Sequence, residues 1–295
     1  MTWFSKRELS GLTLIEVLMT LVLLSILTFA SLELVGDSLD ESRYEQTVQK
    51  MERIKIALIG DPSVRENGVR TSFGYVGDVG KLPDATQGLS ALVARPIAPL
   101  TEIPTYQMVT EARFGAGWNG PYLFSASGSL DTVLDAWGNA ISYDPSSSPP
   151  RLKSYGADGV DDTVGGTSGY RKDIVVELPS ELWQGNVYGY VNNRGSPYKG
   201  AASVVLNRPN PTWAVPSPAV STETVALADY TVATPSPGDP VGQFSFTGVP
   251  FGKRSIVVYV PQPSPTPTMT LGPVIFTMDR KNLELSEDSF DVSNH

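Results

Sequence analysis

Acidic side chains gather in one short, glycine-rich stretch of this chain. Between Ser154 and Asp173 the stretch holds four carboxylates, those of Asp158, Asp161, Asp162 and Asp173. Calcium in proteins takes roughly six to eight oxygen ligands, and glycine-rich loops can turn backbone carbonyls toward it. The composition therefore fits a calcium loop, although it lacks the ligand spacing of an EF-hand. A solvated acidic turn is the alternative interpretation.

A second candidate is Glu16, which lies near the start of the largely apolar run 12–35. An ionised carboxylate in hydrocarbon is unfavourable unless something pairs with it. A cut after Gly11 would give Leu12 a new α-amino group, and Glu16 of one subunit could neutralise the amine of its neighbour during lateral assembly. An ordinary membrane anchor with its carboxylate near the interface is the other interpretation.

Catalysis is not expected from this composition. The chain has no Cys and its single His is His295, so the commonest general base and the usual transition-metal ligands are scarce. Asp161 and Asp162 are adjacent in a glycine-rich loop, which fits metal binding better than separate acid and base roles. No phosphate-binding loop or nucleophile elbow is present. We predict that the protein is not an enzyme, and its net charge of −9 argues against nucleic acid as a partner.

Leu12 and Glu16 would be positioned by a long helix. A helix over 12–35 would be about 36 Å long, enough to cross a ~30 Å hydrocarbon core. Lys6 and Arg7 precede this run and acidic residues follow it, so a cytoplasmic N-terminus is expected. Apolar residues at three- and four-residue spacing from Tyr44 to Leu58 predict that the helix continues as an amphipathic one and ends by Gly60.

Two globular parts are expected beyond the membrane segment. Short apolar runs broken by Gly and Pro predict a small α+β head up to residue 178. After it, alternating β-branched and aromatic residues predict an all-β sandwich. The candidate strands are 187–191, 202–206, 224–232, 243–246, 255–260 and 274–278.

The residues around the proposed cut, Ser10 to Val17, resemble the cleavage and methylation site of type IV prepilins and type II secretion pseudopilins. These families have Gly before the cut and Glu at the fifth mature position, as Gly11 and Glu16 are placed here. The resemblance implies that a prepilin peptidase removes residues 1–11 and methylates the Leu12 amine. Leu12 departs from the Phe that is usual at the first mature position.

Four ordered motifs in the head resemble the major pseudopilin of type II secretion systems: 81–92, 117–123, 135–139 and 154–159. With the leader, this resemblance covers about the first 178 residues. It implies calcium binding, with Asp158 and Asp173 as ligands and Asp161 and Asp162 as further candidates. The chain departs from the family in the insertion-like stretch 59–80 and in Ala136, where the family generally has Pro.

The glycine and apolar pattern of 189–206 and 242–252 resembles carboxypeptidase regulatory-like domains of transthyretin-like fold, which implies turns and a packed sandwich and no catalytic role. We therefore predict an α+β fold class: a leader (1–11), a transmembrane and filament-core helix (12–35), a pilin-type amphipathic helix and head (36–178), and a β-sandwich (184–295).

The expected function is that of a structural pseudopilin. It would be cleaved by prepilin peptidase and would polymerise into a periplasmic fibre for type II protein secretion. Its partners would be copies of itself, other pseudopilins and an inner-membrane assembly platform. Before assembly it would cross the inner membrane once, with its C-terminal domains in the periplasm. The alternative is a surface-exposed type IV pilin-like subunit whose sandwich mediates adhesion or partner binding.

Overall fold

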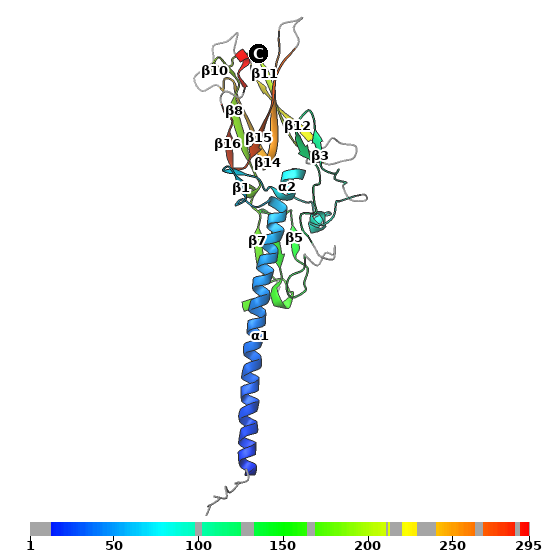
Figure 1. Ribbon diagram of the computed structural model, residues 1–295, viewed down its shortest axis with the longest axis vertical. Coiled ribbons are helices and arrows are strands. Elements are labelled where there is room, and N and C mark those ends of the chain that lie inside the picture. Colours follow the sequence, from blue (N-terminus) through cyan, green and yellow to red (C-terminus); the bar gives the residue numbers. More distant parts are fainter. Residues whose placement is uncertain are drawn as a thin grey trace, which may run out of the picture.

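The computed structural model of the chain describes residues 13–97, 102–124, 133–163, 169–210, 212, 220–228, 240–262, 268–286 and 290–294, without the side chains of 30–37 and 294. One long helix, α1 (Leu14–Ile59), forms the shaft of an elongated molecule. A mixed head packs beside the upper part of α1, and a β-rich part lies beyond its C-terminal end (Figure 1). The predicted mixed architecture with a large β-rich part is confirmed.

Local sequence determines both ends of α1. Thr13 is the N-cap, and its backbone N–H donates a long hydrogen bond of 3.5 Å to the Glu16 carboxylate three residues on. At the other end the helix stops at Gly60, whose φ of 78° is a conformation that glycine adopts without a Cβ clash. The predicted end of the helix by Gly60 is confirmed.

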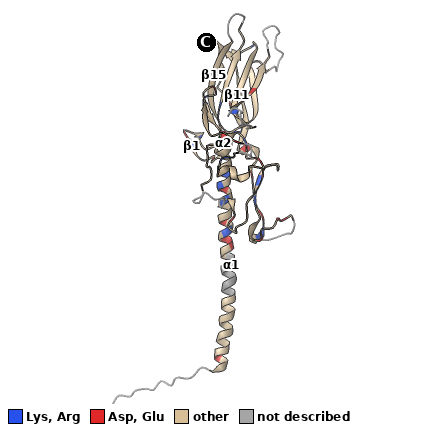
Figure 2. Cartoon of the chain, turned by 90° about the vertical axis from the view of Figure 1, so that its right-hand side faces the viewer, with Lys and Arg blue, Asp and Glu red and all other residues tan. Residues whose placement is uncertain are grey.

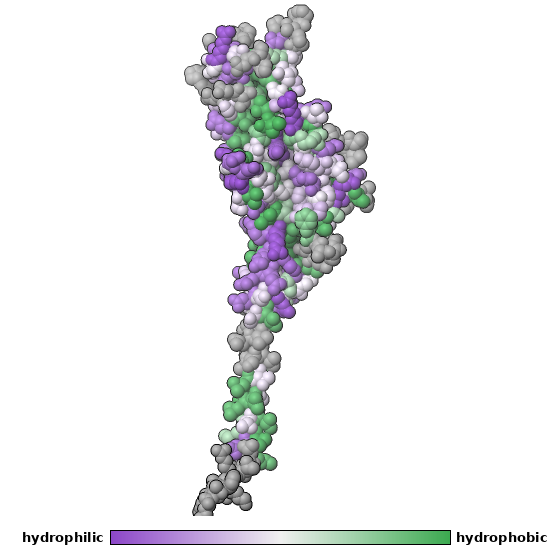
Figure 3. All heavy atoms as spheres, viewed as in Figure 1, coloured by the Kyte–Doolittle hydropathy of each residue, from purple (hydrophilic) through white to green (hydrophobic). Residues whose placement is uncertain are grey.

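The lower part of α1 carries large apolar side chains that pack against nothing else in the described chain. Leu14 is 85% exposed and Phe29 is 73% exposed. Figure 3 shows this section as a mostly hydrophobic surface below a hydrophilic one, and Figure 2 shows charged residues concentrated higher on the shaft. In the described residues, no helix meets the length and apolarity that a membrane crossing requires. The predicted span 12–35 includes Leu12 and the side chains of 30–35, which lie outside the described residues, and it stays a prediction.

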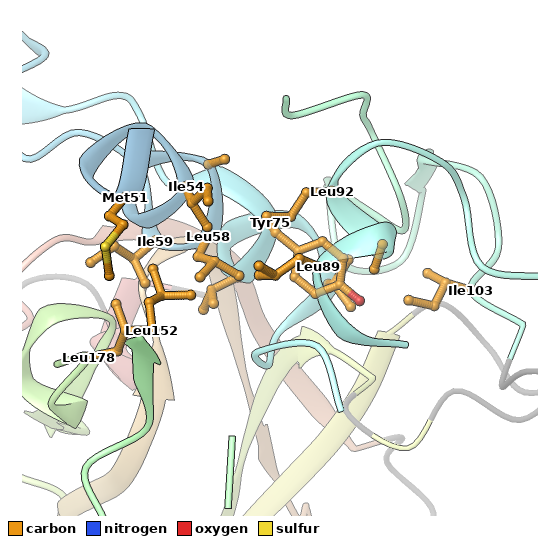
Figure 4. Close-up of a cluster of buried hydrophobic side chains, with 14 of the residues drawn as sticks. Met51, Ile54, Leu58, Ile59, Tyr75, Leu89, Leu92, Ile103, Leu152 and Leu178 are labelled. Carbon is orange, nitrogen blue, oxygen red and sulfur yellow. The ribbon is translucent and has the colours of Figure 1, made fainter. Parts of the chain in front are cut away.

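The head consists of short elements folded around the upper part of α1. They are β1 (Arg65–Glu66), β2 (Val69–Arg70), α2 (Gly74–Val79), η1 (Gly88–Leu92), β3 (Gln107–Val109), β4 (Phe114–Ala116), β5 (Ser142–Asp144), β6 (Arg151–Ser154), η3 (Gly156–Asp158), η4 (Gly169–Arg171) and β7 (Ile174–Glu177). The pairs β1–β2, β3–β4 and β5–β6–β7 are antiparallel. Met51, Ile54 and Leu58 of α1 point into the core that these elements close (Figure 4).

The C-terminal part has two larger sheets that enclose a separate apolar core, and a third sheet of two short strands. Its elements are η5 (Ser180–Leu182), β8 (Gln184–Tyr190), β9 (Asn192–Asn193), β10 (Ser196–Pro197), β11 (Ala202–Pro209), β12 (Val220–Leu227), β13 (Gln243–Pro250), β14 (Gly252–Val260), β15 (Met269–Met278), β16 (Asn282–Glu284) and η7 (Val292–Asn294). One sheet has the order β12-β11-β14-β15 and the other β13-β8-β16. Phe244, Phe246 and Val258 are among the buried residues.

The bounds of several predicted strands were wrong, and one strand of a larger sheet was missed. The strand predicted at 274–278 begins at Met269, and the one predicted at 243–246 continues to Pro250. The strand predicted at 224–232 begins earlier, at Val220, because β12 pairs along its whole length with β11, from Pro209↔Val220 to Ala202↔Leu227. Strand β16 was not predicted. It has three residues and is defined by its parallel pairing with β8, so it is too short to give a periodic signal.

The insertion-like stretch 59–80 supports the sandwich. It forms the hairpin β1–β2 and helix α2, and Arg70 lies over the rings of Phe73 and Phe251 at 5.3 and 5.6 Å. The buried guanidinium of Arg254 in β14 donates to the Gly77 carbonyl of α2 at 3.1 Å. The stretch therefore contacts the sandwich of its own chain.

Candidate functional site

The predicted assembly site lies at the N-terminal end of α1. Gly11 and Leu12, the predicted cleavage and methylation residues, lie outside the described residues. Glu16 is exposed, its carboxylate accepts the hydrogen bond from Thr13, and it makes no ion pair within the described part of the chain. The carboxylate is therefore accessible to a cation from another molecule.

The motif 135–139 anchors the head to α1. Lys50 of α1 donates to the carbonyls of Leu134 and Asp135, at 3.1 and 3.3 Å. The Ala136 N–H donates to Thr47 Oγ1 at 3.0 Å. Pro has no N–H, so this bond requires a residue other than Pro at position 136. The bond is a further contact between the head and α1.

A buried carboxylate connects this motif to the next one. Asp135 Oδ1 accepts from the N–H groups of Trp137 and Asn139, and its Oδ2 accepts from the Ser154 hydroxyl at 2.8 Å. Asn139 in turn donates to the Gly156 carbonyl. Motif 135–139 therefore holds motif 154–159, which leads into the aspartate loop. Asp135 was not among the predicted site residues, and only its place in the motif could have indicated its role.

The first two motifs of the head also contact each other. Trp118 Nε1 donates to the Ala91 carbonyl at 2.7 Å, and the N–H groups of Tyr122 and Leu123 donate to the Leu92 carbonyl. Trp118, Tyr122 and Trp137 pack against the head core, as predicted for large aromatics that hold the fold. The four motifs are thus two pairs of contacting segments.

The aspartate loop brings three of its four predicted ligands together. Asp162 Oδ2 accepts from the Asp173 N–H at 2.8 Å, and the Asp162 N–H donates to Asp173 Oδ2 at 3.1 Å. Asp161 joins them through Lys153, whose Nζ lies 2.9 Å from Asp161 Oδ1 and 2.6 Å from Asp173 Oδ2. Asp158 instead accepts from the Val160 N–H.

The fit of a calcium ion to this loop depends on that lysine. Among the residues that the structure describes, no three His, Cys, Asp or Glu side chains form a group that could hold a metal ion. One buried oxygen, Asp173 Oδ1, has no hydrogen-bond partner there, but an ammonium already lies against the other oxygen of the same carboxylate. The described donor set does not fit calcium, and calcium binding stays a prediction.

A further, partly buried polar group, which the sequence did not indicate, lies between the head and the sandwich. Tyr122 donates its hydroxyl proton to Asp78 Oδ2 at 3.0 Å. Burial raises the pKa of Asp78 to about 6, against the opposing effects of the Tyr122 hydrogen bond and the Arg254 charge. Asp78 and Arg254 are far apart in sequence, so no local pattern could have paired them.

A hollow of about 390 Å³ lies beside this group, lined by residues of both parts that include Arg70, Asp78, Tyr106 and Lys253. Its walls carry both signs of charge.

Comparison with known proteins relates the head to a family of secretion proteins. Residues 73–177, less than half of the chain, match the family model described as "Type II secretion system (T2SS), protein G", and no curated protein or solved structure matches. The matched range contains all four head motifs, including the Asp135 anchor and the aspartate loop. This match to protein G, the major pseudopilin, supports a type II secretion pseudopilin role that is carried out together with other secretion components.

Proposed function

We propose that this chain is a structural pseudopilin subunit that polymerises into a periplasmic fibre for type II protein secretion. A prepilin peptidase cuts after Gly11, removes residues 1–11 and methylates the Leu12 amine. The work is done by assembly, with no chemistry on this chain. The observation that carries the proposal is the protein G match over 73–177, attached here to the 46-residue helix α1.

The exposed lower part of α1 supports this role. Fully burying a Leu, Ile or Phe side chain contributes about 1.5–3 kcal/mol relative to leaving it exposed. Several such side chains between Leu14 and Phe29 are exposed in the single subunit. We propose that the segment 12–35 lies in the inner membrane, with the N-terminus cytoplasmic, and packs against other subunits after assembly.

Glu16 then has a defined role in lateral assembly. Its carboxylate pairs with the Leu12 amine of the neighbouring subunit, and the long hydrogen bond from Thr13 is weak enough to be exchanged for it. A carboxylate paired with an ammonium avoids the cost of an isolated charge in an apolar fibre core. Copies of this chain, other pseudopilins and an inner-membrane platform are the proposed partners.

The sandwich, proposed to be a carboxypeptidase regulatory-like domain of transthyretin-like fold, is carried on the head in a fixed orientation. Arg254 and Ser255 of β14 both bond to head carbonyls, those of Gly77 and Ala112. The surface-adhesion alternative gains no support from the comparisons.

The test is intact-mass and N-terminal analysis of the chain made together with its own prepilin peptidase. A chain that begins at Leu12, with or without a methyl group, is expected, and Gly11→Val should remain at full length because a side chain blocks the cut. A wild-type chain that still begins at Met1 would remove the basis of the proposal.

Pairing at Glu16 needs a separate test. Glu16→Ala should be processed normally but should enter fibres poorly, measured as the sheared-fibre fraction by immunoblot. Glu45→Ala, an exposed carboxylate on the upper part of α1, is the matched control and should assemble normally. Normal fibre yield from Glu16→Ala would rule out the pairing.

A further inference from the structure

Strand β6 supplies a cation to the aspartate loop. Along β6, Leu152 and Ser154 point into the head and are buried, while Lys153 projects from the opposite face. That face is where the loop 159–163 and Asp173 lie, and the Lys153 side chain is only 15% exposed there. Its Nζ also lies 5.3 Å from the centre of the Tyr155 ring. Lys153 is therefore held between a ring and two carboxylates.

Two of the carboxylates near this ammonium, those of Asp162 and Asp173, connect the two ends of the loop. Asp162 and Asp173 exchange hydrogen bonds in both directions between side chain and backbone, which joins the two ends of the loop. The Asp173 side chain is 7% exposed, so its negative charge needs a counter-charge close by. Lys153 at 2.6 Å provides it, and the same Nζ reaches Asp161 across the loop.

An ammonium and a divalent cation would compete for these oxygens. Calcium takes oxygen ligands at about 2.3–2.6 Å, so a calcium ion on Asp173 would lie close to the charged Nζ and be repelled by it. We propose that Lys153 is the resident cation of the aspartate loop and occupies the position that a metal ion would take, so that the segment 159–163 and Asp173 are held together without calcium. The loop thus differs from what the family resemblance implies.

The same geometry predicts a latent metal site. Removing the ammonium would leave Asp161 Oδ1 and Asp173 Oδ2 without a cation, each with one backbone hydrogen bond, from the N–H groups of Thr163 and Asp162. Both oxygens belong to the group that includes the buried Asp173 Oδ1, which has no hydrogen-bond partner in the described chain. Three carboxylate oxygens without a cation would attract a hard divalent ion. A variant that lacks the Lys153 charge should therefore respond to calcium, whereas the wild type should not.

The test is hydrogen exchange with mass spectrometry on the full chain in detergent, in calcium and in EGTA. It follows peptides that contain the amides of Asp162 and Asp173. In the wild type, exchange should be the same in both buffers. In Lys153→Met, exchange of these peptides in EGTA should be faster by about tenfold or more, and calcium should restore the protection.

Two variants control for a general loss of folding. Lys153→Arg keeps the charge and should keep the protection in EGTA. Arg151→Met removes the other cation on the same face of β6, which pairs with Asp144 at 3.8 Å, and should leave the loop unchanged. Calcium-dependent protection of the wild-type loop, or full protection of Lys153→Met in EGTA, would overturn the proposal. If Lys153→Met lost protection from exchange and calcium did not restore it, the claim that the ammonium occupies the position of a metal ion would be wrong.

Discussion

The head and the sandwich bury apolar cores in different ways. The head has strands of two to four residues and closes its core with α1, which contributes Met51, Ile54 and Leu58. The sandwich has strands of up to ten residues and encloses Phe244 and Phe246 between its own two sheets. The family match covers residues 73–177, which is the head without α1 and the hairpin β1–β2, and it includes no residue of the sandwich.

The difference shows which part needs residues from outside its own strands to close its core. The head depends on α1 to close its core, whereas the sandwich core is enclosed by sheets of the sandwich itself. Between them lies a junction of buried polar groups: Arg254 donates to the Gly77 carbonyl and Ser255 to the Ala112 carbonyl. A buried donor or acceptor without a partner is energetically costly. Unfolding one part alone would leave such groups in the other part unpaired, so we expect the two cores to unfold together.

The largest expected effect comes from emptying either core. Phe244→Ala in the sandwich should lower the free energy of unfolding by about 3–5 kcal/mol, and Leu58→Ala in the head by about 2–5 kcal/mol, because each leaves a cavity. Both should shift one common transition in urea unfolding followed by circular dichroism. If each substitution shifted a separate transition, the coupling through the junction would be wrong.

The second largest loss of stability is expected from removing the Arg254 guanidinium at the junction. Arg254→Met leaves the carbonyls of Pro250, Phe251 and Gly77 without these donors, which should cost about 2–4 kcal/mol. It should also split unfolding into two transitions, seen by calorimetry. Lys253→Met changes the exposed neighbouring residue and should retain a single transition. A single transition in Arg254→Met would show that apolar contacts alone join the two parts.

The junction should also respond to pH. Burial raises the pKa of Asp78 to about 6, whereas an unfolded Asp titrates near ~3.9. Between these values the folded state binds a proton that the unfolded state has released, so stability from this group is present below about pH 4 and is lost as pH rises to about 6.

The effect is measured as the difference in unfolding free energy between the wild type and Asp78→Asn at several pH values. This difference should fall by about 2–3 kcal/mol from pH 4 to 6 and then level off. Asp61→Asn is the control, because hydrogen bonds from Ser63 lower the pKa of Asp61 and its effect should appear only at lower pH, with the opposite sign. A flat difference for Asp78→Asn would show that the fold does not raise the pKa of Asp78.

The smallest effect is expected at the edge of the junction. Arg65 of the hairpin lies 3.6 Å from Asp279, but Arg65 is half exposed and Asp279 also pairs with Arg280 at 2.7 Å. Arg65→Ala should therefore change the unfolding free energy by less than about 1 kcal/mol, measured by urea titration. A larger loss would mean that the hairpin carries much of the coupling.

The sequence alone determined features that depend on short stretches of chain. Gly60 stops α1 because its positive φ is local, and alternating apolar residues predicted most sandwich strands because period two is a property of the strand itself. The head motifs indicated the pseudopilin family because each is a contiguous run. The role of Glu16 also follows from local spacing, and it stays a proposal.

Only the tertiary structure decided which groups meet. The lower and upper parts of α1 are both apolar in places, yet Leu58 is buried and Leu14 is exposed, because the head folds against one part alone. Lys153 reaches Asp173 because β6 and β7 pair, and Arg254 reaches Gly77 because the sandwich packs on α2. Such contacts join residues that are distant in sequence, so they arise from chain topology and packing, which no local periodicity encodes.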